Sequence, residues 1–281
     1  MPINTIDRWD GATYSRILLI NDRSAKLEIS RAGEKQIRVQ VQAENDQLPE
    51  KVKPQITGLV EGLLGLRQDL RPFYALADQD RRIRTLKDRF LGLKPPRFPS
   101  VFEALVNAIA CQQLSLSVGI TVLNRLAKAF GRAWQDDSEE LHAFPTPEDL
   151  SAATPTSLRS LGFSYHKAGA LISLARGLRD RTIDFSGIEA LSDDDALAAL
   201  LGLKGVGRWS GEYALLRGLG RLEIFPGDDV GAQNNLETLF RLRTKPDYEK
   251  IRSLTRRWAP FAGLVYFHLL LNKLQAKGYL K

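Results

Sequence analysis

The sequence has one cysteine and three histidines among its 281 residues. Cys111 alone cannot form an intrachain disulfide, and a zinc site of the usual Cys/His type needs more ligands than this chain offers. No apolar run reaches the ~20 residues that a membrane-spanning helix requires. The N-terminal stretch MPINTIDRWDG lacks the charged and apolar regions of a signal peptide. We therefore expect a cytoplasmic protein, nucleoid-associated in a bacterium, with no membrane partner.

The composition is that of a globular protein, with 43% hydrophobic and 26% charged residues. The length suits one large domain or two modest ones. The formal net charge of +7 favours nucleic acid or another acidic surface as a partner. The same charge is equally typical of a basic protein that is merely soluble.

The chain divides into two regions of different periodicity. Apolar and polar residues partly alternate over 14–21, 25–31 and 36–42, which predicts an antiparallel meander. Helical spacing begins near residue 52. The stretch KPPRFP at 94–99 breaks any helix and predicts a linker. We expect an α+β protein, with a small β-rich domain with helices at 1–94 and a domain at 95–281 that contains only helices.

Residues 203–231, LKGVGRWSGEYALLRGLGRLEIFPGDDVG, carry the strongest functional signal. Two helices joined through Gly205 and Gly207 need a left-handed or crowded backbone, which glycine permits. Free N–H groups at the start of the second helix favour an anion, and Lys204 and Arg208 add positive charge. The pattern predicts a hairpin that holds a DNA backbone without reading its sequence. An ordinary αα-hairpin with glycines for packing remains the alternative.

Three segments together resemble the helix-hairpin-helix and Gly-Pro-Asp superfamily of DNA glycosylases, and within it the AlkA-type 3-methyladenine DNA glycosylase II group. They are residues 102–119 (FEALVNAIACQQLSLSVG), 144–175 and the hairpin with FPGDD. The N-terminal strands resemble the β domain of that group more weakly. The resemblance implies a monomeric base excision repair enzyme whose partner is double-stranded DNA containing damaged bases. Alkylated purines are the implied substrates, and hydrolysis of the N-glycosidic bond is the implied reaction.

The resemblance places the catalytic carboxylate at Asp229, the second acid of Asp228-Asp229. Positive charge develops on the deoxyribose as the base leaves, and a carboxylate can stabilise it and orient the attacking water. We expect Asp228 to cap the helix that follows. The alternative is that either acid is only a cap.

The residue at 209 bears on the type of reaction. Family members that also cut the DNA backbone carry a nucleophilic lysine at the second residue after the Gly-x-Gly, where this chain has Trp209. An indole cannot form a Schiff base. Lys204 lies on the other side of the turn, so the chain is expected to be a monofunctional glycosylase that uses water.

The resemblance also implies the residues around the DNA. Trp209 and Tyr213 share a helix face and are expected to stack on a cationic base, unless they are core residues. Gln113 or Leu114 is expected to fill the gap left by the flipped nucleotide, unless they simply end a helix. The expected contacts with the DNA backbone are Lys204, Gly205, Gly207, Arg208 and Ser210.

No organic cofactor is expected, but backbone carbonyls of Leu201, Leu203 and Val206 could hold a structural Na⁺ or K⁺ at the hairpin.

The chain departs from the AlkA pattern at Val230 and at the aliphatic run after His268, which predicts a less aromatic pocket. Two basic clusters, at 81–89 and 241–257, are candidate phosphate contacts or simply solvated faces. The alternatives for function are a non-catalytic protein that binds damaged DNA and a glycosylase for deaminated or oxidised bases.

Overall fold

The computed structural model describes residues 2–34, 36–43, 49–136 and 139–280. Its contacts divide the chain into two compact units. Unit 1 comprises residues 1–56 and 109–184, and unit 2 comprises residues 57–108 and 185–281. This division differs from the predicted boundary after residue 94, because each unit is assembled from two separated segments. Helices α1 (Lys53–Leu63) and α4 (Val101–Cys111) run from one unit into the other.

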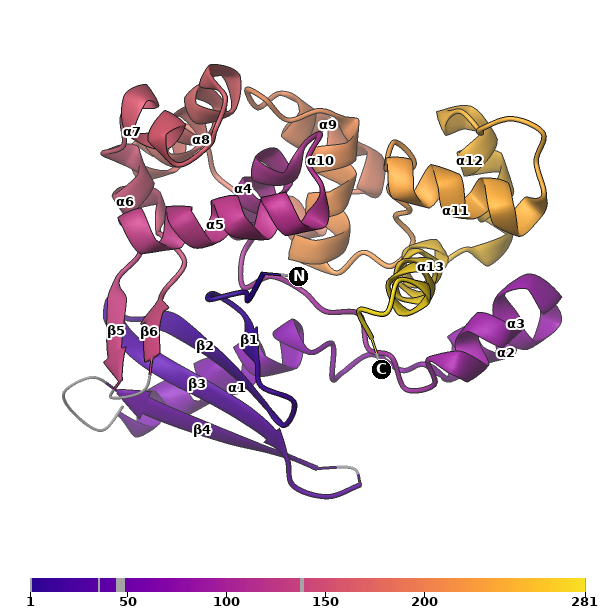
Figure 1. The fold of residues 1–281 in the computed structure, drawn as a ribbon, viewed down its shortest axis with the longest axis horizontal. Coiled ribbons are helices and arrows are strands. Elements are labelled where there is room, and N and C mark those ends of the chain that lie inside the picture. Colours follow the sequence, from indigo (N-terminus) through magenta and orange to yellow (C-terminus); the bar gives the residue numbers. More distant parts are fainter. Residues whose placement is uncertain (1, 35, 44–48, 137–138, 281) are drawn as a thin grey trace. The chain divides into compact units, whose positions relative to one another are not determined.

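Unit 1 contains the predicted meander (Figure 1). Its strands are β1 (Arg8–Trp9), β2 (Thr13–Ile20), β3 (Arg23–Arg31) and β4 (Ile37–Ala43), which pair in chain order and are all antiparallel. Asn21 and Asp22 join β2 to β3 with φ of 50° and 61°. A type I′ hairpin turn has positive φ at both central positions, and Asn and Asp tolerate this conformation.

A second hairpin in unit 1 corrects the expectation of helices alone after the linker. Its strands are β5 (Ala133–Asp136) and β6 (Glu139–His142). Trp134 lies opposite Leu141, and both side chains are buried against Ile17 of β2. The strands are too short for a period to show in the sequence, and their stability depends on packing against a distant strand.

The helices of unit 1 begin where the local sequence supplies a cap. They are α5 (Leu116–Phe130), α6 (Pro147–Ser151), α7 (Pro155–Ser160) and α8 (Tyr165–Arg179). Thr146 and Thr154 each form a reciprocal capping box, with proline directly after them. Ser164 caps α8 through the Lys167 N–H.

Unit 2 is helical in its described residues. Besides most of α1 and α4, its helices are α2 (Arg71–Gln79), α3 (Arg81–Arg89), α9 (Asp193–Leu201), α10 (Arg208–Ala214), α11 (Val230–Phe240), α12 (Tyr248–Thr255) and α13 (Ala262–Ala276). A π-helical turn (Leu215–Leu219) follows α10, and short 3₁₀ turns lie at Ile188–Ala190 and Arg256–Trp258. A further 3₁₀ turn, Glu50–Val52, belongs to unit 1. Ser192 caps α9 at the Asp195 N–H, and three acids occupy the first turn of this helix.

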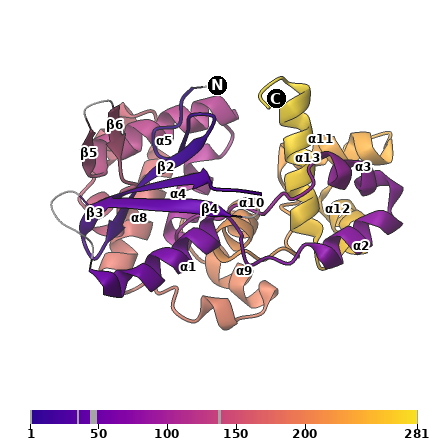
Figure 2. The same ribbon diagram turned by 90° about the horizontal axis from the view of Figure 1, so that it is seen from below.

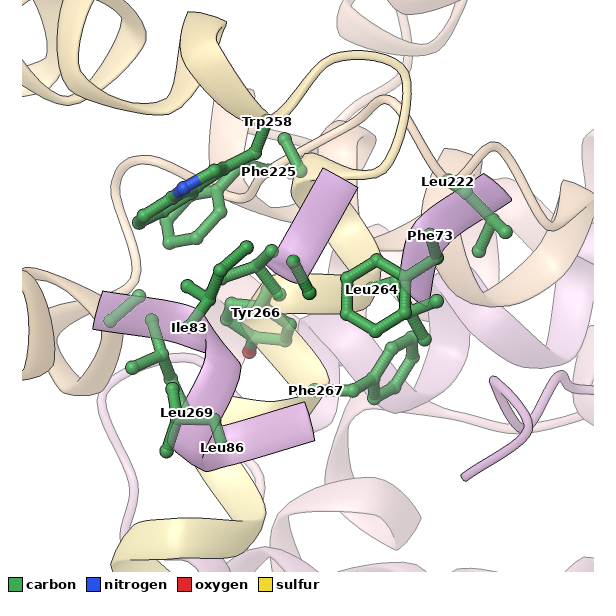
Figure 3. Close-up of a cluster of buried hydrophobic side chains, with 14 of the residues drawn as sticks. Phe73, Ile83, Leu86, Leu222, Phe225, Trp258, Leu264, Tyr266, Phe267 and Leu269 are labelled. Atoms are coloured by element: carbon green, nitrogen blue, oxygen red, sulfur yellow. The ribbon is translucent and has the colours of Figure 1, made fainter. Parts of the chain in front are cut away.

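The core of unit 2 surrounds α13, which lies beside α3 (Figure 2). The apolar side chains of α13 meet those of α2 and α3 (Figure 3). Phe73 of α2, Trp258 and Leu264 are almost completely buried. The indole N–H of Trp258 donates to Asp80 at 3.0 Å, and the same carboxylate caps α3. Residues 70–86 therefore belong to the core of unit 2 and not to the N-terminal sheet.

Two glycines of unit 2 should respond differently to alanine. A Cβ on Gly263 would lie 2.5 Å from the Ile224 carbonyl oxygen, whereas a Cβ on Gly207 would meet nothing within 4 Å. We expect Gly263→Ala to lower the free energy of unfolding by about 1–3 kcal/mol, because crowding a packed core forces its neighbours apart. Gly207→Ala should cost less than about 1 kcal/mol. Thermal or urea unfolding measures both, and equal losses would contradict the packing seen here.

Candidate active site

The hairpin joins α9 to α10 within unit 2. Gly205 has a φ of +79°, in the left-handed region that favours glycine. Gly207 has an extended backbone, with φ of −91° and ψ of 176°, and open space where a Cβ would lie. The backbone therefore requires glycine at 205 only. A side chain at 207 would meet no atom of the described residues within 4 Å.

The predicted backbone-binding residues of the hairpin differ in exposure. Lys204, Gly207 and Arg208 are exposed, whereas Ser210 keeps only 1% of its surface accessible. Ser210 thus lies in the interior of the protein, unlike the other three residues. Val206 is buried and its N–H donates to the Leu203 carbonyl at 3.1 Å, which anchors the turn.

Asp229 receives hydrogen bonds from three elements. Its Oδ1 accepts from the Ala232 N–H at 2.7 Å, which makes Asp229 the N-cap of α11. Its Oδ2 accepts from the Trp209 indole N–H at 3.1 Å and from the Tyr266 hydroxyl at 3.3 Å. The carboxylate is therefore fixed in position, while the residue remains half-buried.

The expectation that Asp228 caps this helix is wrong. A cap accepts from the N–H three residues ahead, and the extended backbone of Asp229 directs its own side chain to Ala232. Asp228 is exposed and lies 4.0 Å from the Arg208 guanidinium. Such a surface ion pair contributes little to stability.

The predicted aromatic pair lies beside this carboxylate. The ring centroids of Trp209 and Tyr213 are 5.4 Å apart, and Phe98 lies 6.1 Å from Tyr213. All three side chains are half-buried. The structure thus brings Trp209 and Asp229 into direct contact and adds Phe98 and Tyr266, which the sequence did not indicate as site residues.

Arg217 places a permanent positive charge in the same aromatic cluster. Its guanidinium carbon lies 4.6 Å from the Phe98 ring, 5.5 Å from Phe267 and 5.6 Å from Tyr213. In the sequence, only its position four residues after Tyr213 relates Arg217 to the predicted aromatic pair. These rings can therefore hold a cation, as cation–π attraction requires.

A buried carboxyl group lies beneath the acid-bearing loop. Glu212 of α10 is 4% exposed and accepts from the Gly227 N–H at 3.0 Å and the Tyr248 hydroxyl at 2.6 Å. Burial raises the pKa of Glu212 to about 7, although both hydrogen bonds favour the ionised form. Its position on a predicted helix gave no sign of this environment.

Gln113 and Leu114, the predicted wedge, belong to unit 1. Gln113 has a φ of +57° and follows the last turn of α4, and Leu114 is 39% exposed. The Lys167 ammonium donates to the carbonyls of Ala110 at 2.9 Å and Gln112 at 2.6 Å. Lys167 thus satisfies carbonyls at the helix end and holds the backbone that presents these two residues.

A family model described as "HhH-GPD superfamily base excision DNA repair protein" matches residues 106–261. The chain belongs to the HhH-GPD superfamily. The resemblance expected from the three sequence segments is thereby confirmed.

Similar proteins extend this match over most of the chain. The DNA-3-methyladenine glycosylase of Bacillus subtilis is 25% identical over 255 residues, which are 91% of this chain and 84% of the relative. DNA-3-methyladenine glycosylase 2 of Escherichia coli is 30% identical over 180 residues, or 63% and 60% of the two chains. The solved 3-methyladenine DNA-glycosylase from Archaeoglobus fulgidus has a TM-score of 0.85 at 26% identity and covers 96% of this chain and 90% of its own.

Two basic clusters of this HhH-GPD protein, far apart in the sequence, meet in unit 2. Arg82 lies 5.0 Å and Arg257 5.2 Å from the ring centre of Phe240. They line an open groove of about 840 Å³, whose lining residues are Pro72, Ala75, Leu76, Gln79, Asp80, Arg81, Arg82 and Arg257. Arg81 and Arg82 of the first cluster and Arg257 of the second therefore share one basic surface.

The described part of the chain holds no group of three or more His, Cys, Asp or Glu side chains suited to a metal ion. Residues Leu201, Leu203 and Val206, whose carbonyls were expected to hold a monovalent cation, lie at the end of α9 and in the hairpin turn. The Leu203 carbonyl accepts the Val206 N–H. No helix in the described ranges combines the length and apolarity needed to span a membrane.

The raised pKa of Glu212 predicts a pH-dependent stability. A carboxyl whose pKa is higher in the folded state, about 7 against 4.5, favours folding below pH 4.5, and this contribution is lost as pH rises through 7. Relative to Glu212→Gln, the wild type should therefore lose about 3 kcal/mol between pH 4 and pH 8. Urea unfolding across this range measures the difference, and a pH-independent difference would contradict the raised pKa.

Proposed function

We propose that this HhH-GPD protein is a monofunctional DNA glycosylase that removes damaged bases, alkylated purines above all, from double-stranded DNA. The observation that carries the proposal is the Asp229 carboxylate, held by three hydrogen-bond donors beside Trp209 and Tyr213. The names of the Bacillus and Escherichia relatives support the same reaction and the same class of base.

Asp229 provides the charge that the reaction needs. As the C1′–N bond breaks, its electrons neutralise the cationic base and leave positive charge on the sugar. A carboxylate fixed in place stabilises that charge without reorganising. Water then adds at C1′, and its proton passes to Asp229 or to solvent. Because two hydrogen bonds hold Oδ2 and one holds Oδ1, the group keeps its orientation through the reaction.

The aromatic cluster supports a preference for cationic bases. Trp209 and Tyr213 offer half-buried rings beside the acid, and a ring face attracts a cation by about 0.5–2 kcal/mol. Val230, directly after Asp229, is 60% exposed and is aliphatic. Trp209 provides no amine for a Schiff base, so the reaction ends with base release.

The remaining features suit a duplex as substrate. The base must leave the helix to reach a carboxylate, and the exposed Leu114 with Gln113 suits the role of the side chain that fills the gap. Gly207 allows a phosphate to approach the main chain, and Lys204 and Arg208 add charge. The shared basic surface supplies further phosphate contacts. We further propose that the protein acts as a monomer. The backbone carbonyls of Leu201, Leu203 and Val206 are the proposed ligands of a structural Na⁺ or K⁺.

Asp229→Asn tests the assigned chemistry. The asparagine side-chain oxygen can still accept the Ala232 N–H and cap the helix. Its NH₂ group would then lie opposite the Trp209 N–H, so that two donors face each other, and the negative charge is lost. We expect base release from duplexes containing 3-methyladenine or 7-methylguanine to fall by about a hundredfold or more, while DNA binding persists. Asp228→Asn removes the same charge one residue away and should stay near wild type. Wild-type protein that binds damaged DNA but releases no base would instead favour a non-catalytic binding protein.

Gly207→Ala tests the hairpin independently of the chemistry. The added methyl group meets no protein atom but would stand where a phosphate approaches the backbone. We expect DNA affinity to fall about tenfold, with fewer ions released on binding and a shallower salt dependence. Affinity measured at several salt concentrations tests this, and an unchanged dissociation constant would remove the hairpin from the interface.

A further inference from the structure

Glu212 and Gly227 connect α10 to the loop that carries Asp229. Gly227 is buried two residues before the acid, and its N–H donates to Glu212 Oε2 at 3.0 Å. Glu212 Oε1 in turn accepts from the Tyr248 hydroxyl of α12 at 2.6 Å. We propose that Glu212 is a positioning residue that holds this loop, and thereby Asp229, in its active place. The proposal rests on the glycosylase function proposed above.

The contacts of Gly227 explain why this one hydrogen bond matters. Its carbonyl accepts from the Gln233 side chain of α11 at 3.2 Å. Both main-chain groups of Gly227 are therefore hydrogen-bonded, the N–H to a residue that precedes the loop and the carbonyl to a residue that follows it. A Cβ at 227 would lie 2.7 Å from the Tyr248 ring, so the loop packs directly on that ring. The Asp229 N–H donates to the Pro226 carbonyl at 3.2 Å, which closes the turn. Displacing Gly227 therefore displaces Asp229.

Charged groups from three elements surround Glu212. Asp228 in the loop disfavours its ionised form, and Arg208 of α10 favours it. On α12, Tyr248 donates to it, and Arg252 lies near Tyr248. The Arg208 guanidinium carbon lies 4.0 Å from the Tyr248 ring centre, so the proposed DNA-contacting arginine packs on the residue that orients Glu212.

This environment makes the support of the loop depend on pH. With a pKa raised to about 7 by burial, Glu212 is neutral in acid and ionised in mild base. Hydrogen bonds to an ionised acceptor are shorter and stronger than those to a neutral one. Within the folded protein, the hydrogen bonds from Gly227 and Tyr248 to Glu212 are thus stronger above pH 7, although the folded state as a whole is less stable there. A glutamine side chain at this position would imitate the neutral form at every pH, so Glu212→Gln is the informative substitution.

Single-turnover base release by purified full-length protein tests the proposal. Glu212→Gln should match wild type at pH 5.5 and be about tenfold slower at pH 8, with DNA affinity unchanged. Glu212→Ala should be slower at both pH values. Tyr248→Phe, which removes only the hydroxyl, should give a smaller loss and guards against a misfolded alanine variant. Glu249→Gln is the matched control, because it removes one carboxylate, as Glu212→Gln does, from an exposed residue next to Tyr248. This variant should behave as wild type. A ratio of wild-type to Glu212→Gln rates that is the same at both pH values would overturn the proposal.

The indole N–H signals of the four tryptophans give a readout that needs no activity. Trp209 donates to Asp229, whereas Trp258 donates to Asp80 in the core of the same unit. In Glu212→Ala we expect the Trp209 signal to shift and the Trp258 signal to stay. If the wild type releases no base but Trp209 still shifts, the glycosylase function fails while the positioning role stands. An unshifted Trp209 in a folded variant contradicts the positioning role itself.

Discussion

The hydrogen bonding of one carboxylate organises the site. Asp229 caps α11 with one oxygen and binds Trp209 of α10 and Tyr266 of α13 with the other. A carboxylate at a helix N-terminus is stabilised there by unpaired N–H groups. The same interaction thus begins a helix, orients the indole and fixes the acid. The proposed chemistry needs a carboxylate that does not move, and the fold provides one at a position where the backbone itself requires an acceptor.

Glycines allow the surrounding elements to approach this carboxylate closely, each for a different reason. Gly205 adopts a left-handed conformation, and Gly263 lets α13 pack against the main chain of 222–224. Gly227 lets the loop lie on the Tyr248 ring. Gly207, in contrast to Gly227 and Gly263, has open space around it, which is consistent with an approach from outside the protein. Local backbone freedom and close packing together determine where the acid-bearing loop lies.

Buried charges are costly unless they are paired, and Glu212 and Arg217 both lie in the site. The Tyr248 hydroxyl and the Gly227 N–H compensate Glu212 in part, but burial still raises its pKa to about 7. Arg217 is surrounded by aromatic faces and donates to the Tyr213 hydroxyl at 3.4 Å. Both groups lie close to the aromatic pair and the acid-bearing loop, so their charges contribute to the electrostatics of the site.

Local sequence patterns were enough to predict many elements and the family. Apolar periods predicted the meander and the helical region that follows it. Three sequence segments, including the hairpin with FPGDD, indicated the superfamily and Asp229 as the candidate acid. The local backbone conformation of the loop decides that Asp229 rather than Asp228 caps α11. Packing between distant segments was needed to show that β5 and β6 form a hairpin and that Glu212 is buried beneath the loop. Local patterns reflect backbone preferences and amphipathic faces, which act over a few residues. The environment of a polar side chain depends on which distant segments pack around it, and that is settled only when the core forms.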